Sequence, residues 1–280
     1  MRSFILLLLL LSFTSAGLAQ DGPAEGTSSD NDPVTKTSVS DPEEKEDPHK
    51  WEMLLQYSQE QLSKGYGTWR TAAVTVERRT GRQQILWGTY RVSERRTMRD
   101  QEFIAGMYRR FENKWAFTAE GMYSPTNKFV GKFSVMGEIE KDLGKGYVAH
   151  AGSRYTSYNT AVKATSVYGL MEKYWGNNRA AYTLYLTDLS NAGTAPSHRI
   201  QYNRYFGERV NSIGTSFSWG REHENLGPGI GILRNNTWST SVSGRFWVTK
   251  NIGINVDGWL HRQGDIYYRG GVNVGTRIRF

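Results

Sequence analysis

The fold is decided by the stretch Gly271-Val272-Asn273-Val274-Gly275-Thr276-Arg277-Ile278-Arg279-Phe280. Successive side chains of a β strand point to opposite faces, so residues two apart share a face. Here the two faces differ in polarity, with Thr276 as an interruption of the apolar one: Val272, Val274, Ile278 and Phe280 lie on one face, and Asn273, Arg277 and Arg279 on the other. The stretch is therefore predicted to be an amphipathic strand with one apolar face and one polar face.

The same two-residue period recurs upstream, whereas the period of an amphipathic helix does not appear after Trp51. Trp115 and Phe117, for example, lie on one face, and Thr118 and Glu120 lie on the opposite face. The segments that alternate most clearly are residues 115–123, 129–139, 238–248 and 252–261. This pattern predicts an all-β fold.

The first residues predict export from the cytoplasm. Arg2 precedes an apolar run from Phe4 to Phe13, and the small residues of Gly17-Leu18-Ala19 fit a signal-peptide cleavage site. We expect residues 1–19 to be a signal peptide, with Gln20 first after cleavage. The alternative is a membrane anchor, but a spanning helix needs about 20 apolar residues, more than this run supplies. The chain has no cysteine, which excludes disulfides, thiol chemistry and an N-terminal lipid anchor.

The composition favours a membrane barrel over a soluble domain. Mean hydropathy is −0.59, yet the chain has 16 Tyr, 9 Trp and 30 Gly. A transmembrane barrel explains this mixture, because each strand needs apolar residues only at the alternate positions that face lipid. A secreted β-sandwich is the alternative, but it would place fewer aromatic residues at strand ends.

Charge divides the chain after Lys50. Nine acidic and three basic residues between Gln20 and Lys50 give a net charge of −6, and this segment lacks aromatic residues. Residues 20–50 are therefore expected to form a disordered acidic periplasmic segment. With the +1 of Arg2 also removed from the whole-chain charge of +8, residues 51–280 carry +13. An exported basic barrel without a nucleic-acid motif is expected to meet lipopolysaccharide phosphates or small anionic solutes, not nucleic acid.

Turn residues separate the strands and set their number. Tight turns are predicted at Thr80-Gly81, Glu112-Asn113, Leu143 to Gly146, Gly176 to Asn178, Gly207-Glu208 and Lys250-Asn251. Between them lie longer or more polar connections, of which Gly220 to Asn236 is the longest. Thirteen strands can be drawn from Trp69 onward, but a tail and a C-terminus that both lie in the periplasm require an even number. Trp51 to Leu62 supplies one more, which predicts a transmembrane antiparallel up-and-down β-barrel of about 14 strands over residues 51–280; 12 or 16 strands also fit.

The last strand resembles those of proteins that the outer-membrane barrel assembly machinery inserts, because it is amphipathic and stops at an aromatic residue. Phe280 is therefore a candidate assembly signal, and the machinery is an expected partner. The alternative is a soluble edge strand that happens to end in Phe. Together with the signal peptide, the strand favours a bacterial outer-membrane location.

Short aromatic and turn motifs resemble the YaiO family of outer-membrane β-barrels. They are Lys173-Tyr174-Trp175-Gly176-Asn177-Asn178-Arg179, Tyr182 to Asp188, Arg204-Tyr205-Phe206-Gly207, Ser218-Trp219-Gly220-Arg221-Glu222, Trp69-Arg70 and Tyr108-Arg109-Arg110-Phe111. The resemblance covers the barrel region from about Trp51 and leaves the acidic segment outside. It implies a membrane barrel, with relatives linked by analogy to envelope and exopolysaccharide systems, and it supplies no reaction and no catalytic residues.

A catalytic site is not predicted. A serine nucleophile needs its histidine base within hydrogen-bond reach, but His150 and Ser153 are three apart and point to opposite faces. His261 shares a face with Asp257 without a serine partner, which favours a hydrogen-bonding pair in the lumen. The five histidines show no metal-ligand spacing, and we expect no metal and no cofactor. Gly227-Pro228-Gly229-Ile230-Gly231 lacks the helix of a phosphate-binding loop and is interpreted as a surface loop.

The tryptophans near segment ends are expected to form the aromatic girdles at the two membrane interfaces: Trp51, Trp69, Trp115, Trp175, Trp219, Trp238 and Trp247. Trp259 and Tyr267 are alternative candidates for binding carbohydrate. The polar faces carry candidates for the lining of the lumen: Glu77, Arg79, Glu120, Glu138, Glu140, Arg154, Arg245, Asp257, His261, Arg277 and Arg279.

These observations predict a non-enzymatic pore or conduit of the envelope, linked to exopolysaccharide or small-solute traffic. The net charge and the inward arginines predict a preference for anions, with the connection from Gly220 to Asn236 as constriction or lid. Two alternatives stay open. One is a structural or ligand-binding surface barrel without an open pore, and the other is a lipid-modifying barrel enzyme.

Overall fold

The computed structural model describes residues 50–80, 83–158, 162–190, 193–207, 211–225 and 232–280. The predicted signal peptide, residues 20–49 and the glycine-rich stretch 227–231 lie outside the described residues. In the part of the chain that is described, no helix is long and apolar enough to cross a membrane.

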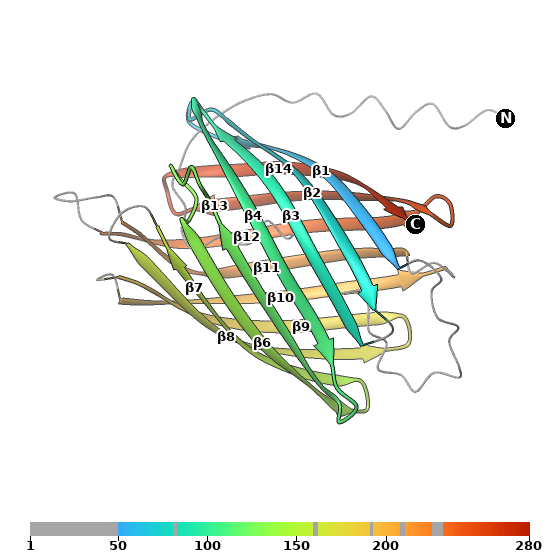
Figure 1. Cartoon of the computed structure of the whole chain (residues 1–280). Coiled ribbons are helices and arrows are strands. Elements are labelled where there is room, and N and C mark those ends of the chain that lie inside the picture. Colours follow the sequence, from blue (N-terminus) through green and yellow to red (C-terminus); the bar gives the residue numbers. More distant parts are fainter. Residues whose placement is uncertain (1–49, 81–82, 159–161, 191–192, 208–210, 226–231) are drawn as a thin grey trace.

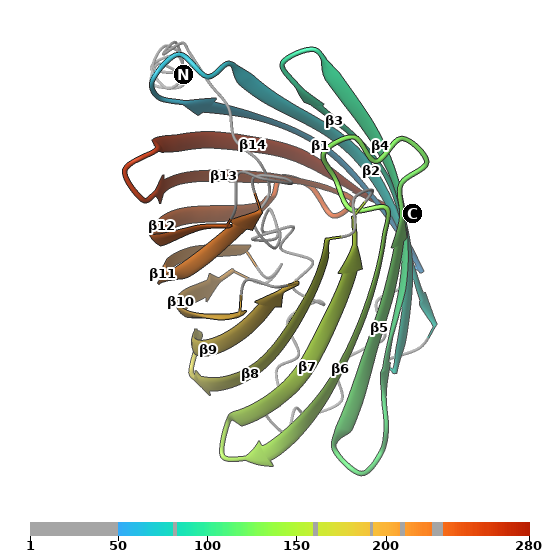
Figure 2. The ribbon, with the colours of Figure 1, turned by 90° about the vertical axis from the view of Figure 1, so that its left-hand side faces the viewer.

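The described residues form fourteen antiparallel strands that close into one barrel, each paired with its neighbours in sequence and β14 paired with β1 (Figures 1 and 2). This confirms the predicted all-β up-and-down barrel and its strand number. The strands are β1 Trp51–Leu62, β2 Thr68–Thr80, β3 Gln84–Arg95, β4 Met98–Arg110, β5 Trp115–Tyr123, β6 Phe133–Gly144, β7 Tyr147–Ser157, β8 Lys163–Trp175, β9 Asn178–Leu189, β10 Gly193–Phe206, β11 Asn211–Asn225, β12 Ile232–Trp247, β13 Ile252–Gln263 and β14 Tyr267–Arg279.

The distribution of side chains is the reverse of that in a soluble protein, because apolar residues lie on the outside of the barrel and polar residues on the inside. On β14, Val272 and Val274 are 42% and 49% exposed, whereas the intervening Asn273 is 8% exposed and Arg277 6%. Alternation places the first two on the outer face and the others on the inner face. An outward apolar face with no protein against it is what a lipid-facing strand requires.

Connections at the two ends of the barrel differ as the turn residues predict. At the end where Trp51 and Phe280 lie, which we call the near end, the described connections include the predicted turns at Glu112-Asn113, Leu143 to Gly146, Gly176 to Asn178 and Lys250-Asn251. Gly81 and Glu208, of the other two predicted turns, lie outside the described residues. The backbones of Trp51 and Phe280 exchange two hydrogen bonds there, of 3.1 and 3.0 Å, and these continue the pairing of β1 with β14. The opposite end, the far end, includes the longest connection, residues 124–132 between β5 and β6.

Two predicted segments are corrected. Phe129 and Gly131 were expected in a strand, but β6 begins only at Phe133. The backbone N–H groups of Phe129 and Val130 donate to the carboxylate of Asp100 instead of to a neighbouring strand. Gly220 to Asn236 was expected to be the longest loop, yet β11 and β12 stay paired as far as Asn225 and Ile232. On β11 the run Arg221-Glu222-His223-Glu224-Asn225 is polar at successive positions, so the two-residue period that marks a strand is absent from the sequence there.

Candidate functional site

The inner wall of the barrel is the candidate functional site, and the predicted lumen residues lie on it. The alternation of each strand places them opposite the exposed apolar residues of the outer face. They come from seven strands: Glu77 and Arg79 from β2, Glu120 from β5, Glu138 and Glu140 from β6, Arg154 from β7, Arg245 from β12, Asp257 and His261 from β13, and Arg277 and Arg279 from β14.

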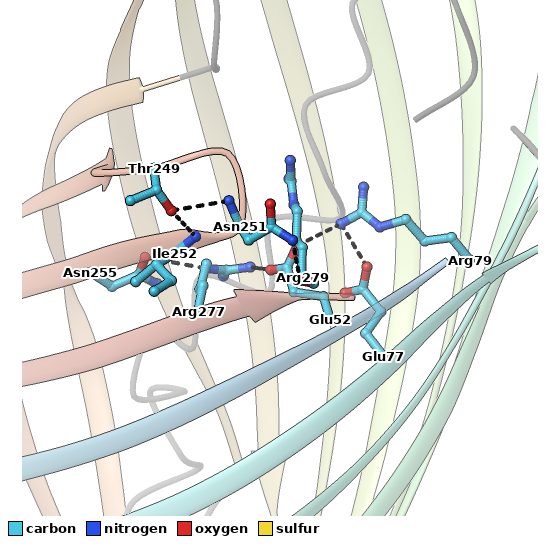
Figure 3. A network of polar contacts seen from close by, with 9 residues as sticks. All are labelled: Glu52, Glu77, Arg79, Thr249, Asn251, Ile252, Asn255, Arg277 and Arg279. Atoms are coloured by element: carbon cyan, nitrogen blue, oxygen red, sulfur yellow. Dashed lines mark hydrogen bonds and ion pairs between the residues drawn. The ribbon is translucent and has the colours of Figure 1, made fainter. Parts of the chain in front are cut away.

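One buried carboxylate gathers three arginines at the near end; we call this group the Glu52 network (Figure 3). Glu52 is 3% exposed and pairs with Arg277, with Arg279 Nε at 2.9 Å and with Arg79 Nη2 at 3.5 Å. Arg79 also pairs with Glu77 at 2.7 Å, and Arg277 donates to Asn255 Oδ1 at 3.2 Å. The network joins β13, β14, β1 and β2, so it fastens the seam where the first and last strands meet.

A second cluster, the His150 network, lies on the inner faces of β6 to β9. His150 Nδ1 is 3.0 Å from Glu138 Oε1, and its Nε2 is 3.8 Å from Glu172 Oε2. Arg179, which is 5% exposed, pairs with Glu172. Tyr168 donates its hydroxyl to Glu138 at 2.7 Å. His150 is thus held between two carboxylates, while Ser153 lies on the outer, exposed face.

Many arginines on the inner wall form an ion pair, with a carboxylate oxygen within 4 Å of the guanidinium group. The arginines paired in this way are Arg79, Arg91, Arg110, Arg154, Arg179, Arg269, Arg277 and Arg279. The basic excess of the sequence lies instead on turns, such as Lys114 and Lys145, and on outward positions such as Arg78 and Lys141. Net charge therefore overstates how basic the lumen is.

Several outward aromatic rings at the near end, those of Trp51 and Trp115 among them, lie close to basic side chains. Trp51, Trp115 and Trp175 are 41%, 40% and 44% exposed. The Arg78 guanidinium lies 5.4 Å from the ring centre of Trp51, and Lys141 Nζ lies 4.5 Å from that of Trp115. Such pairs are typical of a membrane interface, where the ring meets lipid and the cation meets headgroups.

Further along the outer face, Trp219 and Trp238 occupy directly opposed positions on β11 and β12. Trp219 stacks on His198 of β10, with ring centres 5.2 Å apart and planes 15° apart. Sequence reasoning did not single out His198 for an outward position. The two-residue period could have shown this, because His198 shares the spacing of Ile200 and Tyr202, which lie on the outer face of β10.

The structure corrects two members of the predicted girdle, because Trp69 and Trp247 point inward and are 4% and 7% exposed. Trp69 packs with Leu62 and Tyr267 at the far end, and the Arg95 guanidinium lies 3.7 Å from its ring centre. Both tryptophans are one residue out of phase with outward neighbours, so strand alternation decides against a girdle position. Tyr267 is 3% exposed in this cluster, which leaves its ring no accessible surface for carbohydrate.

A buried aspartate at the far end, which sequence reasoning missed, holds the connection 124–132. Asp100 of β4 is fully buried, and its Oδ1 accepts from the backbone N–H of Lys128 at 2.9 Å. Its Oδ2 accepts from Phe129 at 2.8 Å and from Val130 at 3.1 Å. The Arg95 guanidinium lies 4.5 Å from the ring centre of Phe129. The connection 124–132 is thus fastened to the inner side of the barrel mouth.

Replacing Asp100 with Asn is expected to release this connection. The asparagine amide keeps one acceptor oxygen, but its NH2 group replaces the other oxygen and faces backbone N–H groups that then have no acceptor. Each buried donor left unpaired costs about 1–3 kcal/mol. Trypsin should then cleave after the exposed Lys128 or Lys132 at least about tenfold faster than in the unmodified barrel. Mass spectrometry of the fragments checks this. Equal cleavage rates in both proteins would show that Asp100 does not restrain the connection.

A family model for the YaiO membrane beta barrel domain matches residues 50–225, more than half of the chain. The chain belongs to the YaiO membrane beta-barrel family. The match confirms the resemblance found in the sequence and spans β1 to β11, while β12 to β14 complete the same closed sheet. No curated protein matches the chain in sequence.

Solved outer-membrane barrels resemble the YaiO barrel in fold. A "Bacterial polysaccharide outer membrane secretin" superposes with a TM-score of 0.54 at 12% identity, covering 84% of this chain and 100% of that chain. A "CymD monoaromatic hydrocarbon channel" gives a TM-score of 0.54 at 8% identity, with coverage of 82% and 88%. At these identities the likeness shows the fold alone. Family and fold together place the YaiO barrel in the bacterial outer membrane.

Proposed function

We propose that this YaiO barrel is a non-enzymatic conduit for polar solutes, linked to exopolysaccharide or small-solute traffic. The observation that carries the proposal is the direction of the inner ion pairs. Arg277 to Glu52 joins neighbouring strands, and Arg154 of β7 to Glu120 of β5 skips one strand. Pairs of this kind run along the wall instead of across the barrel, so they brace the wall without filling the axis.

The barrel wall offers solutes polar groups of both signs. Paired charges have little net field at a distance, so we infer that the conduit suits uncharged polar or mixed-charge solutes better than simple anions. Outward basic residues at the far end, such as Arg221 and Arg262, are proposed to meet lipopolysaccharide phosphates.

Ion currents test this proposal directly. Purified protein in a planar bilayer should give stable channels with a chloride-to-potassium permeability ratio within about threefold of one, because the wall charges are paired. Glu120→Gln leaves the 41% exposed Arg154 side chain without its partner and should shift the ratio toward chloride. Arg154→Gln is the matched control and should shift it toward potassium.

Three results would contradict the proposal. Folded protein that passes no current would favour a closed structural or ligand-binding barrel. A strong anion preference in the unmodified protein would show that the net positive charge, and not the pairing of wall charges, determines the selectivity. A lipid species that appears on overexpression and disappears in a His150→Ala variant would favour a lipid-modifying enzyme.

A further inference from the structure

Three aromatic rings of the inner wall lie flat over glycines of the adjacent strand. Trp87 of β3 covers Gly106, Tyr168 of β8 covers Gly152, and Trp259 of β13 covers Gly271. A methyl group on Gly106 would lie 2.8 Å from Nε1 of Trp87 and closer still to two ring carbons, and the other two sites are equally tight. Each ring and its glycine are directly opposed in the strand register.

The glycines determine which way these rings face. Without a side chain on the neighbouring strand, the ring can rest against the backbone, so one of its faces meets the wall and the other meets the lumen. The three rings are half-buried, in contrast to Trp69 and Tyr267, which are packed away at 4% and 3% exposure. Each of the three rings therefore keeps part of its surface exposed inside the barrel, and the ring of Tyr168 also contacts the tilted ring of Tyr185, with ring centres 5.5 Å apart.

Each flat ring has a hydrogen-bonding side chain beside it. Glu77 is directly opposite Trp87 on β2, and Ser241 is directly opposite Trp259 on β12. Glu138 accepts from the hydroxyl of Tyr168 at 2.7 Å. The rings are also distributed around the wall, because three or four strands lie between any two of β3, β8 and β13 in the closed sheet.

We propose that Trp87, Tyr168 and Trp259 are stacking platforms for the sugar rings of a carbohydrate chain in the lumen. A pyranose presents C–H groups on its faces and hydroxyls at its edge, which match an aromatic surface bordered by carboxylate and hydroxyl groups. An apolar hydrocarbon would meet the same rings but would desolvate the polar neighbours without bonding them, which disfavours that ligand. This inference rests on the proposed conduit and names its substrate class.

Binding to the full chain, purified and folded in detergent, tests the platforms independently of conduction. The probes are cellohexaose and maltohexaose, followed by isothermal titration and by tryptophan fluorescence. At least one should bind saturably, and Trp87→Ala and Trp259→Ala should each weaken that binding about tenfold, since each removes one stacking face. Trp259→Phe keeps a flat ring and should retain most of the affinity. Trp175→Ala, an outward tryptophan, is the matched control and should bind as the unmodified protein does.

The results separate this inference from the proposed function. Heat-modifiable migration on a gel first shows that each variant is folded. Failure of both oligosaccharides to bind, or equal binding by all variants, overturns the platforms, even if the barrel conducts ions. Oligosaccharide binding by a barrel that passes no current overturns the conduit and leaves the platforms standing. Displacement of the bound sugar by toluene, or saturable binding of toluene alone, would assign the rings to an apolar ligand instead.

Discussion

Glu52→Ala should lower the free energy of unfolding of the barrel by about 3–5 kcal/mol, the cost of leaving a buried ion pair with one partner. Glu52 is 3% exposed and faces Arg277, Arg279 and Arg79. Removal of its carboxylate leaves three neighbouring guanidinium groups without the negative charge that they share. Because the Glu52 network spans the seam between β14 and β1, the loss falls where the barrel closes.

Urea unfolding of protein refolded into lipid vesicles measures this change. Glu120→Ala is the matched control, because its partner Arg154 is 41% exposed and such pairs contribute at most about 1 kcal/mol. Adding Arg277→Ala to Glu52→Ala should restore part of the lost stability, since it removes a buried unpaired charge. If Glu52→Ala were no more destabilising than Glu120→Ala, the seam would not depend on this network.

Strand phase explains how far the sequence predicts this barrel. The alternation of β14 assigns Arg277 and Val274 to opposite faces correctly, because lipid on one side and water on the other impose a strict two-residue period. The same rule, applied to Trp69 and Trp247, assigns them inward. Their position near strand ends suggested a girdle, but phase decides which face a side chain occupies and end position does not.

Contacts between distant parts of the chain explain what the sequence could not predict. The loop 124–132 is fixed by Asp100, and nothing in the local sequence shows that Lys128 to Val130 donate to it. The partners of the inward charges depend on register and side-chain reach, as with Arg154, which passes over β6 to Glu120 on β5. Net charge therefore predicted an anion-selective lumen, whereas paired charges favour weak selectivity.

Phe280→Asp should strongly reduce the amount of protein in the outer membrane while leaving the stability of refolded protein almost unchanged. Phe280 is 59% exposed, and its backbone pairs with Trp51 at the seam. Near a membrane interface an outward carboxylate costs only about 0–1 kcal/mol, so the folded barrel should tolerate it. A large loss in cells would then reflect failed recognition of the last strand during assembly, as expected if Phe280 is an assembly signal.

Two measurements on the same variant distinguish recognition from stability. Immunoblots of separated outer membranes from growing cells should show at least about a tenfold decrease, whereas urea unfolding of protein refolded in vitro should shift by less than about 1 kcal/mol. Phe280→Tyr keeps the aromatic ring and should restore the outer-membrane level, and Ile278→Asp controls for an outward charge elsewhere on β14. If Ile278→Asp and Phe280→Asp reduced the level equally, any charge on this face would suffice, and the ring of Phe280 would carry no special role in assembly.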